Sequence, residues 1–139
     1  MSPKFKTAID FALYFLKFRP RSEKEVRLRL AQKGFAKKEI ETTILQLKKS
    51  GLIDDKVFAQ KWVEWRDATS PRASRVLKLE LKQKGVAEDI IEQMVSPEKD
   101  KMRIKKLIKQ KKFLEKEKLA QFLARRGFGW EQIKETLKE

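Results

Sequence analysis

The sequence predicts an all-α protein made of three tandem three-helix repeats that form an elongated, curved array. Three observations support this prediction: a helix–glycine pattern that occurs three times, apolar residues at helical spacing, and no stretch of strand-like alternation. Charged residues make up 40% of the 139 residues, while glycine and proline are scarce. That composition is typical of a helix-rich protein with a large surface.

Each copy of the pattern is centred on a glycine: Gly34, Gly85 or Gly127. Counted from the glycine, apolar residues stand at −8, −4, +1, +6 and +10, and a basic residue stands at −1. Positions −8 and −4 share a helix face, and glycine can adopt the left-handed conformation that ends a helix. The glycines are 51 and 42 residues apart, which is a spacing typical of helical repeats. We therefore expect repeats at residues 1–52, 53–96 and 97–139.

In the first repeat we expect helices at residues 5–18, 22–33 and 37–49. Pro20 ends the first of these, because the residue before a proline is driven out of the helical region. Ser22 and Glu25 have the spacing of a capping box that begins the second helix. The third helix carries apolar residues at helical spacing and ends at Gly51.

Similar signals delimit the helices of the other two repeats. Asp54 is a good N-cap for a helix that continues to about residue 67. Ser70 and Pro71 are expected to cap and begin the next helix, which Gly85 ends, and a sixth helix follows it. Ser96-Pro97 repeats that device for a seventh helix. The eighth helix is expected at residues 115–126, and the ninth runs from Gly129-Trp130 to near the C-terminus.

The chain contains neither cysteine nor histidine. Disulfides, thiol nucleophiles, the usual catalytic triads and zinc sites are therefore excluded. The adjacent carboxylates Asp54 and Asp55 are best explained as residues of a helix start, and no glycine-rich phosphate loop is present. We expect a protein that is not an enzyme and that has no cofactor and no metal. No apolar run approaches the ~20 residues that span a bilayer, the start lacks the features of a secretory signal, and cysteine is absent, so we expect a cytoplasmic protein with no membrane partner.

The net charge of +15 predicts a polyanionic partner. Residues 1–50 hold 13 Lys/Arg against 5 Asp/Glu, residues 51–96 hold 8 against 8, and residues 97–139 hold 14 against 7. Two basic ends therefore flank a neutral middle, where Trp62 and Trp65 are candidates for packing on a protein partner. We expect the basic residues to contact a nucleic-acid backbone without reading its sequence. They are Arg19, Arg21, Lys24, Arg27 and Lys33; Lys105, Lys106, Lys109, Lys111 and Lys112; and Arg125 and Arg126.

An aromatic stripe on the first helix leaves a second function open. Phe11, Tyr14, Phe15 and Phe18 share one side of that helix, where core packing is the ordinary use of such residues. If the stripe were instead a docking surface, the chain would be a helical adaptor whose binding is insensitive to salt. A third alternative is a helical protein that binds nucleic acid on its own, with no protein target.

The order of these motifs resembles that of the bacterial RecX family. The resemblance is carried by Arg19-Pro20-Arg21-Ser22, by Lys33-Gly34-Phe35 and by Gly51-Leu52-Ile53-Asp54-Asp55. Lys84-Gly85-Val86 and Arg126-Gly127-Phe128 continue it in the second and third repeats. The resemblance implies a monomeric regulator that binds filaments of the RecA recombinase on single- or double-stranded DNA. It further implies inhibition of strand exchange and of ATP hydrolysis.

Overall fold

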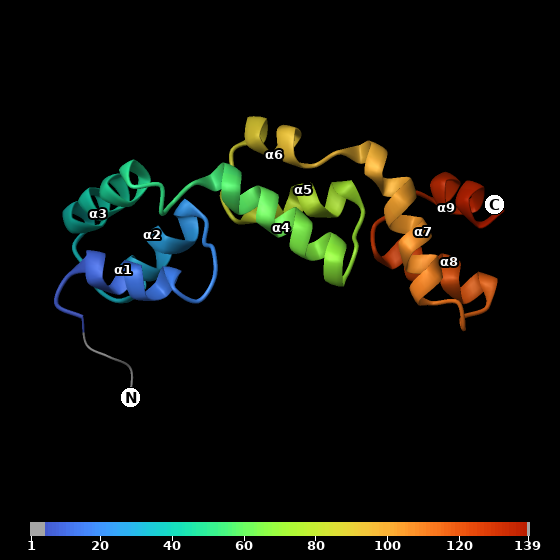
Figure 1. Ribbon diagram of the computed structural model, residues 1–139, viewed down its shortest axis with the longest axis horizontal. Coiled ribbons are helices and arrows are strands. Elements are labelled where there is room, and N and C mark those ends of the chain that lie inside the picture. The colour runs from blue at the N-terminus through green and yellow to red at the C-terminus, as the bar shows by residue number, and fades with distance from the viewer. Residues whose placement is uncertain (1–4, 139) are drawn as a thin grey trace.

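The computed structural model describes residues 5–138, and within them it contains only helices and connecting segments. Three helical bundles follow one another along the long axis of the molecule and form a shallow arch (Figure 1). The predicted fold class, three tandem three-helix repeats in an elongated and curved array, is therefore confirmed.

The bundles have the following helices. The first contains α1 (Ala8–Leu16), α2 (Glu23–Gln32) and α3 (Lys37–Lys49). The second contains α4 (Asp55–Thr69), α5 (Ser74–Gln83) and α6 (Glu88–Met94). The third contains the 3-10 helix η1 (Pro97–Lys99), α7 (Asp100–Gln110), α8 (Lys116–Arg125) and α9 (Trp130–Lys138).

The first helix is shorter than the predicted span of residues 5–18. The Thr7 side chain accepts a hydrogen bond from the amide of Asp10 and begins the helix there. At the other end, the amide of Lys17 donates to the carbonyl of Tyr14, which tightens the last turn. The predicted capping box at Ser22 and Glu25 is present at the start of α2.

Each bundle encloses a hydrophobic cluster of its own. The apolar positions of the repeat pattern supply much of each cluster, including Leu30, Leu81 and Leu123 at position −4. Two residues pack outside their expected repeat: Ile53 belongs to the first cluster and Ala73 to the third. Because the cores are separate, the shape of the molecule depends on the junctions between the bundles.

Both junctions use a carboxylate in the same way. The amide of Glu23, the first residue of α2, donates to Asp55 Oδ1 at 2.9 Å. The amide of Ser74, the first residue of α5, donates to Asp100 Oδ1 at 2.9 Å. Asp55 and Asp100 are themselves the first residues of α4 and α7. The first helix of one repeat therefore caps the middle helix of the repeat before it.

This contact corrects the prediction for the start of α5. The helix begins at Ser74 rather than at Pro71, and Ser70 is the residue that follows α4. The N-cap residue, Ala73, has no side chain that could accept a hydrogen bond. Asp100 supplies the missing acceptor, and its other oxygen accepts from the Ser74 hydroxyl at 2.7 Å.

The second junction is also held by a buried ion pair. Arg103 and Asp100 are 4% and 6% exposed, and Arg103 donates to Asp100 Oδ1 at 2.8 Å. Arg103 also bonds Asp67 of α4 at 2.8 Å. Burial opposes the charge of Arg103, but the hydrogen bonds to Asp67 and Asp100 outweigh it and raise the pKa of Arg103. Arg103 therefore adds a second tie between these repeats, beside the contact of Asp100 with Ser74.

The repeat glycines lie at the same junctions. Gly34, Gly85 and Gly127 all have a positive φ, as the helix-ending prediction requires. A Cβ on Gly127 would come within 2.4 Å of Val76 Cγ2 on α5, whereas a Cβ on Gly34 would meet nothing within 4 Å. A Cβ on Gly85 would likewise meet Lys24 on α2 at 2.6 Å. The end of each later middle helix thus packs closely on the start of the preceding one.

We expect Gly127→Ala to destabilise the protein more than Gly34→Ala. Both substitutions place alanine at a positive φ, which costs about 1–2 kcal/mol. Gly127→Ala adds overpacking against Val76, which costs roughly 1–3 kcal/mol more. Urea unfolding followed by circular dichroism measures both changes, and equal losses would contradict the close approach at the junction.

Asp100→Asn is expected to lower the free energy of unfolding by roughly 3 kcal/mol, because it leaves the buried Arg103 without the more deeply buried of its two countercharges. Asp89→Asn is the matched control, since Asp89 lies exposed in the first turn of α6. Urea unfolding should show a small loss for Asp89→Asn and a large one for Asp100→Asn. Similar small losses in both variants would show that the ion pair does not hold the junction.

Candidate partner-binding surface

Basic residues gather where the first and second repeats meet. Arg19 and Arg21 lie in the loop before α2, and Lys84 follows α5. Arg19 and Lys84 both pair with Glu25, at 2.8 and 3.5 Å. Two cations therefore share one carboxylate. Burial disfavours the charge of Glu25, but hydrogen bonds from Arg19 and from the Ser22 amide outweigh it and lower the pKa of Glu25.

Arg21 lies close to Arg19, and its surroundings disfavour its positive charge. Its guanidinium lies over the Phe15 ring, 4.0 Å from the centroid. Burial lowers the pKa of Arg21, and the nearby charge of Arg19 lowers it further. Two arginines therefore lie close together here, and the charge of Glu25 offsets part of their repulsion.

Three arginines gather in the same manner at the second junction. Arg126, which follows α8, donates to the Ser70 hydroxyl, and its guanidinium lies 4.9 Å from the Phe122 centroid. Burial lowers the pKa of Arg126, and the charges of Arg72 and Arg66 lower it further. Arg66 and Arg72 are held there by Glu80, at 2.7 and 3.9 Å.

The two clusters occupy equivalent places in the repeat. Lys84 and Arg126 both stand immediately before a repeat glycine, and Arg21 and Arg72 both stand thirteen residues before one. The buried Nε–H groups of Arg21 and Arg72 both lack a hydrogen-bond acceptor within residues 5–138. Positive charge is therefore concentrated once per junction. We call these groups the first and second junction clusters: Arg19, Arg21 and Lys84; and Arg66, Arg72 and Arg126.

Only some of the sequence-predicted basic residues lie in these clusters. Lys24 lies next to the first, where its Nζ donates to the carbonyl of Gln83 at 3.3 Å. Arg27 pairs instead with Glu23 and Glu41, and Lys33 lies over the Phe11 ring at 5.3 Å.

The basic residues predicted between positions 105 and 112 do not all lie on one helix face. The helix ends at Gln110, so Lys112 lies beyond it, and the aligned pair is Lys105 and Lys109. Lys106 turns toward the second junction and donates to the carbonyl of Asp67. Lys111 lies between the rings of Phe113 and Phe122, and Arg125 is exposed at the end of α8.

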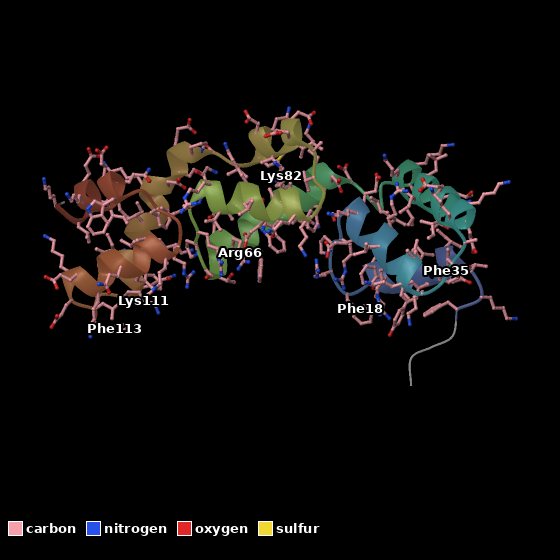
Figure 2. The ribbon with its side chains drawn as sticks, turned by 180° about the vertical axis from the view of Figure 1, so that it is seen from behind. Phe18, Phe35, Arg66, Lys82, Lys111 and Phe113 are labelled. Carbon is pink, nitrogen blue, oxygen red and sulfur yellow. The ribbon has the colours of Figure 1, made fainter. Side chains whose placement is uncertain are left out.

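Sequence reasoning left out Arg66, Arg72 and Lys84 as candidate site residues. No local run of basic residues marks these three positions. They can be recognised only when the repeats are aligned on their glycines or when the fold brings them together. Figure 2 shows Arg66 on the inner side of the arch, with Phe18 toward one end and Lys111 toward the other, whereas Lys82 lies on the opposite edge.

The aromatic stripe on α1 is divided between core and surface. Phe11 is buried in the first cluster and Phe15 packs against it, while Tyr14 and Phe18 remain exposed. Half of the stripe therefore serves the core, and Tyr14 and Phe18 remain as a small surface for the adaptor alternative.

Other kinds of site find little support in the part of the chain that the structure describes. No three Asp or Glu side chains of residues 5–138 gather as metal ligands would. Across the same residues, no helix combines the length and the apolar character needed to cross a bilayer.

Three family models match the chain in succession. They are those of the first, second and third three-helix domains of RecX, and they match residues 8–47, 54–95 and 97–137. The chain belongs to the RecX family. Its curated relatives include "Regulatory protein RecX" of Chlorobium phaeobacteroides, 34% identical over 95% of this chain and 92% of the relative. The RecX of Bacillus pumilus is also 34% identical, over 97% of this chain and 54% of its own longer sequence.

Solved RecX structures share the fold. The crystal structure of RecX from Lactobacillus salivarius has a TM-score of 0.72 and 26% identity, and the match covers 94% of this chain and 92% of that one. A second crystal structure of a RecX has a TM-score of 0.76 at 22% identity, covering 95% of this chain and 70% of that one.

We expect the double variant Arg72→Gln/Arg126→Gln to bind a random-sequence DNA duplex more weakly and with less salt dependence. Each lost phosphate contact should reduce the slope of log K against log salt by about 1, hence by about 2 here. Fluorescence anisotropy at four salt concentrations measures this slope. Lys37→Gln/Lys38→Gln on α3 is the control with the same loss of charge, and equal changes in both variants would contradict a role for the second junction cluster.

Proposed function

We propose that this chain is a regulator of the RecA recombinase, which binds RecA filaments on DNA and inhibits their strand exchange and ATP hydrolysis. The observation that carries the proposal is the match of all three RecX domains, in order, over nearly the whole chain. The relatives are named regulatory proteins, and the same role is inferred for this chain.

The shape of the molecule supports this proposal. Three bundles in a row present a long surface with little bulk on either side (Figure 1). Such a surface can contact several successive subunits of a filament at once, as repeat arrays often do with extended partners. Because each contact adds to the others, binding to a filament should exceed binding to a free subunit.

The charge of the molecule supports it as well. A net charge of +15 favours a polyanion, and a recombinase filament on DNA carries the phosphates of its bound strand. The junction clusters supply cations at two places along the arch, and the α7 lysines supply more at one end. We propose that the chain acts as a monomer, in the cytoplasm where bacterial DNA lies, and without catalytic chemistry of its own.

A second candidate is a nucleic-acid-binding protein that needs no recombinase. The observation that favours it is the crowding of Arg66, Arg72 and Arg126, which suits a phosphate backbone with or without protein around it. The two candidates differ in how much protein is needed to inhibit ATP hydrolysis by RecA. A protein that only coats DNA must cover most of the strand before it displaces RecA.

The proposed function predicts that substoichiometric amounts of this protein inhibit ATP hydrolysis by RecA on single-stranded DNA. The test is a titration at two salt concentrations, with RecA from the same organism. Inhibition well below one molecule per RecA subunit is the expected result. Full ATPase activity at saturating amounts of this protein would refute the proposal, and inhibition only after the DNA is fully coated would favour the second candidate.

Reversal of Lys105, Lys106 and Lys109 to Glu should raise the concentration needed for inhibition by at least about tenfold, since like charges then face the DNA. Reversal of Lys37, Lys38 and Lys49 on α3 changes the net charge equally and serves as the control. Equal effects would show that total charge, rather than its location on α7, governs inhibition.

A further inference from the structure

A groove lies between the first two repeats, and its walls are aromatic. Its volume is about 640 Å³. Phe58 and Trp62 of α4 form one side, with ring centroids 5.9 Å apart, and Trp65 follows at 5.4 Å from Trp62. Pro20 lines the groove from the loop of the first repeat. Phe58 is almost fully buried, but Trp65 is 50% exposed and can receive a flat partner.

The polar rim of this groove is cationic. Besides the aromatic residues and Pro20, it is lined by Arg19, Lys61 and Lys84. Arg19 and Lys84 share the single carboxylate of Glu25, and no ion pair involves Lys61 within the described residues. The rim therefore carries an excess of positive charge around an apolar interior.

The groove continues in two directions. A neighbouring hollow shares Arg19, Pro20, Phe58 and Lys61 with it and adds the exposed Leu52 and Val57. At the other end, Arg66 lies over Trp62 and Trp65, at 5.2 and 4.8 Å from their centroids.

Arg66 also belongs to the second junction cluster with Arg72 and Arg126. Figure 2 places Arg66 on the inner side of the arch. The cations thus form a track that begins at the aromatic groove and runs toward the third repeat.

We propose that this groove binds single-stranded nucleic acid, with a base stacked on Trp65 and the phosphates on the cationic rim and track. Stacking platforms inside a positive groove are the usual means of holding a single strand without reading its sequence. An acidic peptide would also meet the charge, but the tryptophan faces beside a succession of cations fit a chain of flat rings and phosphates better. The proposal concerns the free protein, so it goes beyond inhibition of RecA.

The test measures binding of a fluorescein-labelled thymidine 12-mer by anisotropy, with no recombinase present. Trp65→Ala should weaken binding by about fivefold or more, while Trp65→Phe, which keeps an aromatic face, should retain most of the affinity. Trp130→Ala is the matched control, since Trp130 is 54% exposed but lies on α9, in the third repeat. A loss in Trp65→Ala no larger than that in Trp130→Ala would overturn the proposal.

A second measurement does not depend on the folding of the Trp65→Ala variant. In Trp130→Phe, the remaining tryptophans, Trp62 and Trp65, both lie in the groove. Their fluorescence should be quenched by the thymidine 12-mer and much less by an abasic 12-mer of the same charge. Equal quenching by the two strands, or equally tight binding of a polyglutamate peptide, would overturn base stacking. Because RecA is absent, either result leaves the proposed inhibition of the filament untouched.

Discussion

The capping of one repeat's middle helix by the next repeat's first helix is the contact on which the array depends. The buried apolar residues of positions 5–138 fall into three separate clusters, one for each bundle, so polar contacts at the junctions carry much of the connection between bundles. Asp55 and Asp100 instead accept from the first amides of α2 and α5, where the helix dipole is positive. The carbonyl ends of α5 and α8 meet these same helix starts, through Lys24 and Arg75, so the middle helices follow one another head to tail.

This packing also determines where positive charge collects. The base before each repeat glycine stands at the C-terminal end of its own helix, where it offsets the helix dipole. At the junctions, that base also approaches the loop that precedes the middle helix of the repeat before it. Lys84 shares the carboxylate of Glu25 with Arg19, and Arg126 donates to Ser70 close to Arg72. Only glycine leaves room for the ends of α5 and α8 to pack against the starts of α2 and α5. Gly85 and Gly127 therefore also bring the cations beside them close to the preceding repeat. The cation clusters therefore recur at equivalent positions in successive three-helix repeats.

The fold could be predicted from the sequence largely because its signals are local. Helix stripes, the Ser22 capping box and the Asp54 cap depend on residues a few positions apart. The start of α5 was mispredicted because its cap, Asp100, lies 26 residues away in another repeat. The junction clusters were missed for the same reason, since Arg126 and Ser70 are 56 residues apart. The basic residues chosen from local runs were only partly the ones that the fold assembles, as Arg27 and Lys33 show.

The middle repeat has no net charge, yet its inner side is basic. Asp55 and Asp67 are held in junction contacts, and Glu80 is bound by Arg66 and the indole of Trp62. Several other carboxylates of this repeat lie on α6, along the outer edge of the arch (Figure 1). The inner side therefore keeps its arginines and lysines while its acids are engaged. A net charge counted along the sequence cannot show this, because it assigns equal weight to a carboxylate that caps a buried helix and to one in solvent. Each junction cluster sets three cations against one carboxylate, Glu25 or Glu80, so both junctions keep a net positive charge for a partner as long as the arch itself.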